Sequence, residues 1–221
     1  HYLRDMFYKW LAGEANDVPQ NNPNPFWVDI DWVLSYEKAE EQWNDAIETL
    51  ILNENAIKQI KKYLHELGYI AEKRTEFDFI NIPFSEWDKH HYQHISINFY
   101  DWNLIVEAFT QFTGLFVALG SFTFKFLAKG KIEYFENNFS VKVEQIAGFV
   151  HDTFNFESSE NPFKDILGYW NCADKQMNIY EVIDGELMTN GRFRELREYN
   201  KIGNDFTVLS NQKIIDVFAI I

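Results

Sequence analysis

Residues 119–156 read LGSFTFKFLAKGKIEYFENNFSVKVEQIAGFVHDTFNF, and this stretch decides the fold class of the chain. Apolar and polar residues alternate along most of it, which is the pattern of a β-strand with one buried face. Two short breaks interrupt the alternation, at residues 129–131 (KGK) and 136–138 (ENN). Gly and Asn tolerate the backbone angles of a tight turn, so the pattern predicts three long antiparallel strands joined by two turns.

Helix and strand patterns flank this central stretch. Apolar residues at helical spacing predict helices over residues 2–11, 36–52, 55–67, 101–117 and 189–199. Alternating residues predict shorter strands over residues 26–34, 77–82, 94–99, 166–170, 179–183, 206–209 and 214–220. We therefore expect an α+β fold in which the N-terminal helices pack on one face of an antiparallel sheet. No long linker divides residues 1–221, so a single domain is predicted, mostly helical through residue 118 and β-rich from residue 119.

The composition of the 221-residue chain excludes several classes of protein. Hydrophobic residues make up 46% of the chain and aromatic residues 18%, which is too apolar for a disordered protein. The formal net charge of −14 opposes binding to nucleic acid or to an anionic membrane surface. Cys172 is the only cysteine, so neither an internal disulfide nor a cysteine-based zinc site can form within the chain.

No part of the chain has the pattern of a transmembrane segment. The longest apolar run, residues 102–128, carries charged residues and is broken by two glycines, so it predicts a buried helix and a strand. The chain starts at His1, without an initiator Met and inside a helical pattern. We therefore expect it to be a fragment of a longer protein.

Three imidazoles fall within five residues in the stretch 88–94, DKHHYQH. On a helix, His90 and His94 would share one face and could bind zinc. Glu86 or Asp88 would then supply a third ligand. The local pattern instead indicates a loop that enters a strand, where the two side chains would lie much farther apart. We expect no cofactor, and a divalent metal at these histidines is the alternative that the sequence leaves open.

The candidate catalytic residues are Asp152, Asn155 and His151, at the end of the central stretch. A polar group where a strand leaves a sheet suits acid-base chemistry, because the sheet fixes its direction while the following loop admits a substrate. His151 and Asp152 are neighbours, so on a regular strand they point to opposite faces and form no dyad. The alternative is that Asp152 and Asn155 bind turn amides.

The only dense positive cluster of this acidic chain lies on the predicted helix 189–199. Arg192, Arg194 and Arg197 could clamp a phosphate or a carboxylate, and Trp170 in the stretch LGYWN is a further candidate for substrate binding. The alternative is that the arginines pair with surface acids. No nucleophile elbow, phosphate loop or dinucleotide fingerprint is present, so the sequence leaves open whether the protein is an enzyme.

The C-terminal half resembles an uncharacterised bacterial family that is often encoded near type VI secretion spike genes and polymorphic toxin loci. The resemblance rests on residues 118–120 (ALG), 152–156 (DTFNF), 167–171 (LGYWN), Thr189, Asn190, Phe193, Arg194, Arg197, 203–206 (GNDF) and Ser210. It implies an antibacterial effector of interbacterial competition, cytoplasmic in the producing bacterium and delivered to the periplasm of a target cell. Its partners would be a cognate immunity protein and secretion spike or adaptor proteins.

The order of residues 152–156 also resembles, more distantly, the aspartate-tyrosine-aspartate signature of colicin M-type enzymes, which cleave a lipid-linked peptidoglycan precursor. This resemblance implies that Asp152 is the essential carboxylate, that Asn155 replaces the second one, and that Arg192 or Arg194 meets the pyrophosphate.

A second hypothesis for function involves no catalysis. The family pattern has an arginine directly before the aspartate and a second acid after it. This chain has His151 and Asn155 at those two positions. Together with the acidic charge, this departure favours an immunity or adaptor protein that binds a cognate toxin or a secretion spike. Exposed tryptophans would anchor such a contact, and the candidates are Trp27, Trp32 and Trp87.

Overall fold

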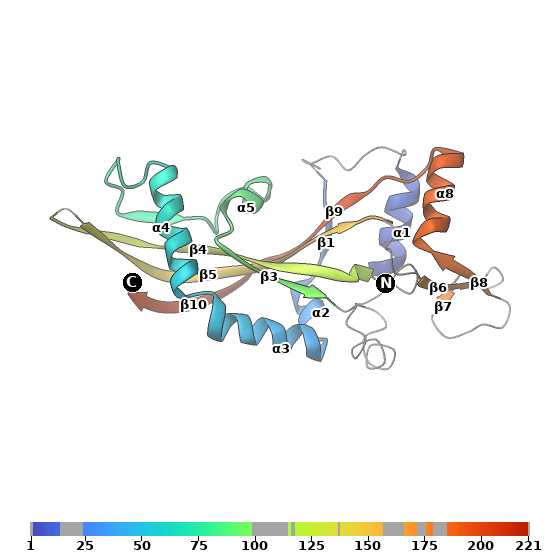
Figure 1. The fold of residues 1–221 in the computed structure, drawn as a ribbon, viewed down its shortest axis with the longest axis horizontal. Coiled ribbons are helices and arrows are strands. Elements are labelled where there is room, and N and C mark those ends of the chain that lie inside the picture. The colour runs from blue at the N-terminus through green and yellow to red at the C-terminus, as the bar shows by residue number, and fades with distance from the viewer. Residues whose placement is uncertain are drawn as a thin grey trace. The chain divides into compact units, whose positions relative to one another are not determined.

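The computed structural model describes residues 2–13, 24–98, 115, 118–136, 138–156, 166–171, 176–178 and 185–220 of the chain. These residues form an α+β fold, with N-terminal helices and a mostly antiparallel sheet of seven strands (Figure 1). The strand order is β1-β9-β5-β4-β2, with β10 also paired to β5 and β3 paired to β4. A smaller sheet has the order β7-β6-β8. The predicted fold class is confirmed.

Most predicted elements are present, with shifted ends. The helices are α1 (Tyr2–Ala12), α2 (Ile30–Leu34), α3 (Glu37–Asp45) with a π-helical continuation η1 (Ala46–Leu50), α4 (Glu54–Glu66), α5 (Phe84–His90) and α8 (Asn190–Asn200). The strands are β1 (Phe26–Val28), β2 (Glu76–Asp78), β3 (Gln93–Asn98), β4 (Ser121–Phe135), β5 (Asn138–Phe154), β6 (Ile166–Asn171), β7 (Gln176–Asn178), β8 (Gly185–Thr189), β9 (Phe206–Ser210) and β10 (Lys213–Ile220). The predicted helix 101–117, apart from Leu115, and the predicted strand 179–183 lie outside the described residues.

The chain divides into two compact units, each assembled from three separate segments. The first unit comprises residues 1–26, 98–121 and 152–208. The second unit comprises residues 27–97, 122–151 and 209–221. Both units therefore combine stretches that are distant in the sequence.

The central stretch forms two long strands, and the prediction of three strands with a turn at residues 129–131 is wrong. β4 and β5 pair along their whole shared length, down to Phe135 opposite Asn138. Gly130 lies inside β4 opposite Val143, where the register shifts. A Cβ atom on Gly130 would stand 2.0 Å from the carbonyl oxygen of Lys142, so the glycine permits a close approach of two backbones at a bulge.

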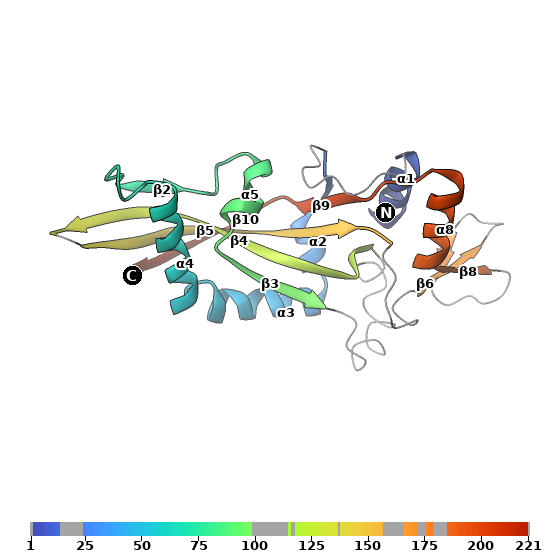
Figure 2. The same cartoon turned by 45° about the horizontal axis from the view of Figure 1, so that its top comes forward.

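In the second unit, α3 and α5 cover opposite faces of the sheet (Figure 2). The Trp43 ring of α3 lies 5.1 Å from Phe124 and 5.5 Å from Phe126, between ring centroids. Trp87 of α5 lies 5.0 Å from Phe149, which belongs to the other face by strand alternation. Both faces of the two long strands are therefore covered where these helices lie.

Helix α4 has a clear apolar stripe. Ala56, Ile60 and Leu64 are buried at the spacing of one helix face. The helix begins after Asn53, whose side-chain oxygen accepts a hydrogen bond of 2.9 Å from the backbone N–H of Ala56. The predicted helix 55–67 is confirmed.

Two predictions for local structure are wrong, because the starts of two helices, α2 and α5, were missed. The predicted strand 26–34 stops after three residues, where the Asp29 carboxylate accepts a hydrogen bond of 2.9 Å from the N–H of Asp31 and begins α2. The predicted loop before β3 contains α5, which starts after Pro83. The Trp87 indole donates a hydrogen bond of 3.0 Å to the carbonyl of Ile82 and fastens the start of this helix.

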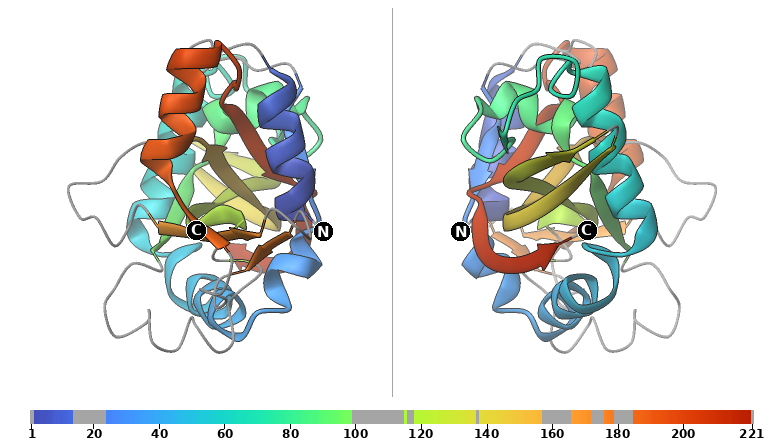
Figure 3. Two further views of the ribbon diagram at one scale, coloured as in Figure 1. Left: turned by 90° about the vertical axis from the view of Figure 1, so that its right-hand side faces the viewer. Right: turned by 90° about the vertical axis from the view of Figure 1, so that its left-hand side faces the viewer.

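The first unit has an aromatic core in which α1, α8 and the end of β5 meet (Figure 3). Phe156 stacks on Phe193 of α8 with 4.3 Å between ring centroids. Phe7 of α1 lies 5.0 Å from Phe193 and 5.5 Å from Phe154. Such ring pairs add about 0.5–1.5 kcal/mol each to the free energy of burial.

Candidate functional site

A buried carboxylate links α1 to α8 in the first unit. Oδ1 of Asp205 accepts a hydrogen bond of 3.0 Å from the indole nitrogen of Trp10, and Oδ2 accepts one of 2.9 Å from Nη1 of Arg197. Asp205 is only 6% exposed. Arg197, a predicted substrate-binding residue, is therefore already engaged by a buried acid.

The glycine that precedes this carboxylate has a packing role. Gly203 has a φ of +93°, and a Cβ atom there would lie 2.2 Å from the ring of Trp10. The backbone N–H of Asn204 donates a hydrogen bond of 3.1 Å to the carbonyl of Trp10. Residues 203–206 (GNDF) therefore hold the Trp10 side chain in place within the first unit. The family resemblance rests partly on these residues.

Asp152 lies near the end of β5, on the strand face that also carries Phe154. Its side chain is half-buried. Burial raises the pKa of the Asp152 carboxyl to about 7, against the weaker effect of a hydrogen bond from the backbone N–H of Thr153. A carboxyl with this pKa exchanges its proton near neutral pH, which is the property that acid-base chemistry requires.

The other two candidates at the end of β5, His151 and Asn155, do not lie on the same strand face as Asp152 or hydrogen-bond to its side chain in the described part of the chain. His151 is the adjacent strand residue and points to the opposite face, where it contributes to the second unit. Asn155 is half-buried and follows the last residue of β5. The structure therefore forms no dyad from His151 and Asp152.

Helix α8 carries the predicted arginines. The side-chain oxygen of Thr189 caps the helix by accepting a hydrogen bond of 3.3 Å from the N–H of Arg192. Arg192 is exposed and Arg194 is half-buried. Within the part of the chain that the structure describes, no ion pair joins Asp152 to an arginine of α8. Trp170 lies in β6, and its side chain is outside the described part.

A charged cluster on the second unit was not predicted. The Lys125 ammonium pairs with the Asp88 carboxylate, and Nε2 of His151 lies 3.6 Å from Oδ1 of Asp88. Burial and then the Lys125 charge lower the pKa of His151, while Asp88 opposes both. Burial raises the pKa of Asp88, but the hydrogen bond from Lys125 and the charge of His151 outweigh it and lower this pKa.

The histidines of the stretch 88–94 are divided between two elements, so His90 and His94 do not share a helix face. His90 ends α5, and its Nδ1 donates a hydrogen bond of 2.9 Å to the carbonyl of Glu86. His94 lies in β3, where its ring centroid is 5.7 Å from that of His91. Among the described residues, no group of three or more His, Cys, Asp or Glu could hold a metal ion.

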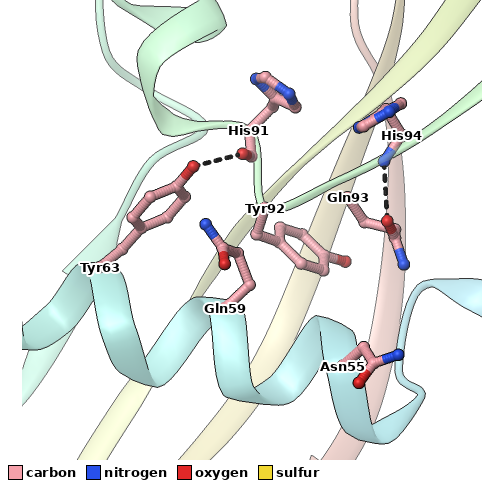
Figure 4. Close-up of a pocket in the computed structure, with 7 residues that line it drawn as sticks. All are labelled: Asn55, Gln59, Tyr63, His91, Tyr92, Gln93 and His94. Carbon is pink, nitrogen blue, oxygen red and sulfur yellow. Dashed lines mark hydrogen bonds between the residues drawn. The ribbon is translucent and has the colours of Figure 1, made fainter.

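A polar pocket of about 310 Å³ opens beside these histidines (Figure 4). Its lining residues come from α4 and from the junction of α5 with β3: Asn55, Gln59, Tyr63, His91, Tyr92, Gln93 and His94. The Tyr63 hydroxyl donates a hydrogen bond of 3.1 Å to the carbonyl of His91 and joins the two walls. Sequence reasoning missed the α4 wall, although polar residues at positions i, i+4 and i+8 beside the apolar stripe were a readable signal.

Comparison with known proteins identifies a family. The sequence profile described as "Family of unknown function (DUF6402)" matches residues 5–188. Neither a curated protein nor a solved structure matches the chain. Separately, no helix among the described residues is long and apolar enough to cross a membrane.

Proposed function

The chain belongs to the DUF6402 family, a family of unknown function, and we propose that it is an antibacterial effector domain linked to type VI secretion. The observation that carries the proposal is the Asp152 carboxyl, half-buried at the end of a long strand with a pKa of about 7. A carboxyl of this kind can take up a proton and release it at cellular pH. The connection to secretion rests on the sequence resemblance.

The proposed substrate is a lipid-linked cell-envelope precursor, as the resemblance to colicin M-type enzymes implies. Ionised Asp152 would take a proton from a water molecule while the water oxygen bonds to a phosphorus of the pyrophosphate. The opposite P–O bond would break, its oxygen would take up a proton from solvent, and Asp152 would return to solvent the proton that it accepted. Arg192 and Arg194 would bind the phosphate oxygens. In this scheme the protein would act in the periplasm of the target cell.

Expression in a bacterial host tests the effector proposal. The chain is produced once in the cytoplasm and once with an export signal that directs it to the periplasm, and growth is recorded. We expect arrest on export and normal growth with the near-isosteric variant Asp152→Asn. Asp31→Asn, which changes an exposed acid of the other unit, is the matched control and should stay toxic. Normal growth in both compartments, or equal toxicity of the Asp152→Asn protein, contradicts the proposal.

A second candidate function is binding without catalysis, as an immunity or adaptor protein. The observation that favours it is Trp27, which is 43% exposed and whose ring centroid lies 5.5 Å from Phe84 and 6.1 Å from Trp87. A rigid exposed tryptophan is a frequent anchor of protein interfaces. Co-purification with a toxin or spike protein of the same locus, lost in Trp27→Ala, would support it. Failure to protect cells from any toxin of that locus would remove the immunity role.

A further inference from the structure

One wall of the pocket beside α4 is a row of polar side chains. Asn55, Gln59 and Tyr63 follow one another at intervals of four residues and therefore share a helix face. Asn55 is exposed and Gln59 is half-buried, and neither carboxamide bonds to another residue in the described part of the chain. Each offers two N–H donors and one acceptor oxygen to the pocket.

The other wall contributes a buried hydroxyl without a partner. Tyr92 is 4% exposed, and its hydroxyl has no hydrogen-bond partner among the described residues. Figure 4 shows the Tyr92 ring between the strand and α4, with the hydroxyl on the side of Asn55 and Gln93. An unpaired buried hydroxyl costs about 1–3 kcal/mol, so a polar ligand atom that bonds to it would recover this free energy.

The tautomer of His91 is fixed, and Figure 4 shows that its ring points away from α4. Nδ1 of His91 lies 2.7 Å from the backbone carbonyl of Asp88, which can only accept, so Nδ1 carries the proton and Nε2 keeps its lone pair. Burial and the nearby Lys125 charge lower the pKa of His91, which keeps the ring neutral at physiological pH. The His94 ring stands 5.7 Å away between centroids.

The charge of the pocket restricts the ligand. None of the seven described lining residues is an Asp, Glu, Lys or Arg, although the whole chain has a formal net charge of −14. An ionised ligand would enter such a site without a counter-charge, which is unfavourable. The pocket instead offers two carboxamides, a buried hydroxyl without a partner among the described residues and aromatic faces.

We propose that this pocket binds an uncharged monosaccharide. Each sugar hydroxyl is both a donor and an acceptor, so neighbouring hydroxyls match the mixed donors and acceptors of Asn55, Gln59 and Tyr92. The apolar C–H face of the ring can lie on an aromatic side chain of the wall. The volume of about 310 Å³ is at the small end of ligand pockets, about 300–1,000 Å³, which suits one ring. The inference does not depend on the effector proposal, because it concerns other residues.

Direct binding measurements on the whole chain test this inference. Glucose, galactose, mannose and N-acetylglucosamine are titrated separately and followed by saturation-transfer NMR and by the ring signals of His91 and His94. We expect at least one of these sugars to bind with a dissociation constant in the millimolar range and to shift the His91 signals. Glucuronate, adenosine and zinc ions serve as the charged, nucleoside and metal probes.

Two matched variants identify the site. Tyr92→Phe keeps the ring and removes the hydroxyl, so we expect at least about fivefold weaker binding together with a melting temperature raised by about 2–4 °C. Tyr134→Phe is the control in the same unit, because the Tyr134 hydroxyl donates a hydrogen bond of 3.0 Å to the carbonyl of Arg74, away from the pocket. It should bind the sugar normally and melt at a lower temperature.

The inference is overturned by three results. The first is that none of the four sugars binds at concentrations well above the millimolar range. The second is that Tyr92→Phe binds as tightly as the original protein, which would place the sugar elsewhere. The third is that only zinc ions or adenosine shift the His91 and His94 signals, which would make the pocket a metal or nucleoside site.

Discussion

The indole of Trp10 donates a hydrogen bond to the carboxylate of Asp205, although 195 residues separate the two in the sequence. Trp10 is completely buried and Asp205 is 6% exposed, so the bond is shielded from water. The same carboxylate binds Arg197, and Gly203 leaves room for the Trp10 ring. This polar contact inside an aromatic core holds α1 in one orientation within the first unit.

Asp205→Ala should strongly destabilise the protein. It removes the acceptor of the Trp10 N–H and the buried carboxylate that pairs with Arg197, and breaking one partner of a buried charged pair costs about 3–5 kcal/mol. Asp205→Asn keeps an oxygen for Trp10 and should cost clearly less. Urea unfolding followed by tryptophan fluorescence measures both variants, and equal losses for the two would show that the charge on Asp205 contributes nothing.

Gly130→Ala should disturb the β4–β5 pair. The new Cβ atom would lie 2.0 Å from the carbonyl oxygen of Lys142, and this backbone atom cannot turn away as a side chain can. We expect a loss of about 3 kcal/mol, at the upper end for overpacking. Gly191→Ala is the matched control, because its Cβ atom would meet nothing nearer than the Thr189 hydroxyl at 3.6 Å. Thermal unfolding of both variants should show a large loss of stability for Gly130→Ala only. A Gly130→Ala protein as stable as the original would refute the close contact.

The free energy of unfolding should fall as the pH rises through the range in which Asp152 loses its proton. The pKa of Asp152 is about 7 in the folded chain and 3.8 ordinarily, so the folded state binds the proton more tightly. The stabilisation is complete below the ordinary pKa and is lost as the pH rises to 7 and above. The difference amounts to at most about 4 kcal/mol.

Asp152→Asn isolates this effect, because the amide resembles the protonated carboxyl at every pH. Urea unfolding at about pH 4 should give similar stabilities for the two proteins, and at about pH 8 the variant should be the more stable one. Parallel pH curves for the two would mean that the pKa of Asp152 is ordinary.

Removal of the Lys125 charge should raise the pKa of two histidines. Lys125 is a cause of the lowered pKa of both His151 and His91, so Lys125→Gln should move both toward the ordinary 6.5. Their ring signals in an NMR pH titration measure the change. Lys129→Gln is the control, because Lys129 pairs with Asp78, 3.1 Å away, and contributes to neither shift.

The same variant has a consequence for stability in acid. A lowered histidine pKa stabilises the folded state above pH 6.5 and costs stability as the pH falls below it, because the unfolded chain then binds the proton more readily. Lys125→Gln should therefore lose less stability than the original protein between neutral pH and about pH 5. An unchanged titration of His151 would mean that the Lys125 charge is screened by solvent.

The fold class could be predicted because it depends on local pattern. Alternation over residues 119–156 identified a long antiparallel region, although it predicted three strands where the chain forms two, and the helical stripes identified α1, α4 and α8. The role of Gly130 could not be predicted in this way. A glycine between two lysines reads as a turn, and only the partner strand reveals that the backbone at Lys142 comes too close for a side chain.

The candidate site was predicted only in part, because its chemistry depends on distant partners. Asp152 was singled out from its place at a strand end, but its raised pKa comes from burial that no local pattern reports. The approach of Asp88 to His151 joins residues of α5 and β5. The unpaired hydroxyl of Tyr92 could not be predicted either, because the sequence does not show which side chains surround it in the folded chain.

The division of each unit into three segments limits how much of the chain can fold while the ribosome is still synthesising it. The second unit takes up residues 27–97 early but also needs residues 209–221, and the first unit needs residues through 208. Neither can finish folding while its last segment is still inside the exit tunnel, so the aromatic stretches synthesised first must wait for late partners. A cut between residues 118 and 119 would leave both units incomplete. Chaperone binding to the nascent chain is the expected result of this arrangement.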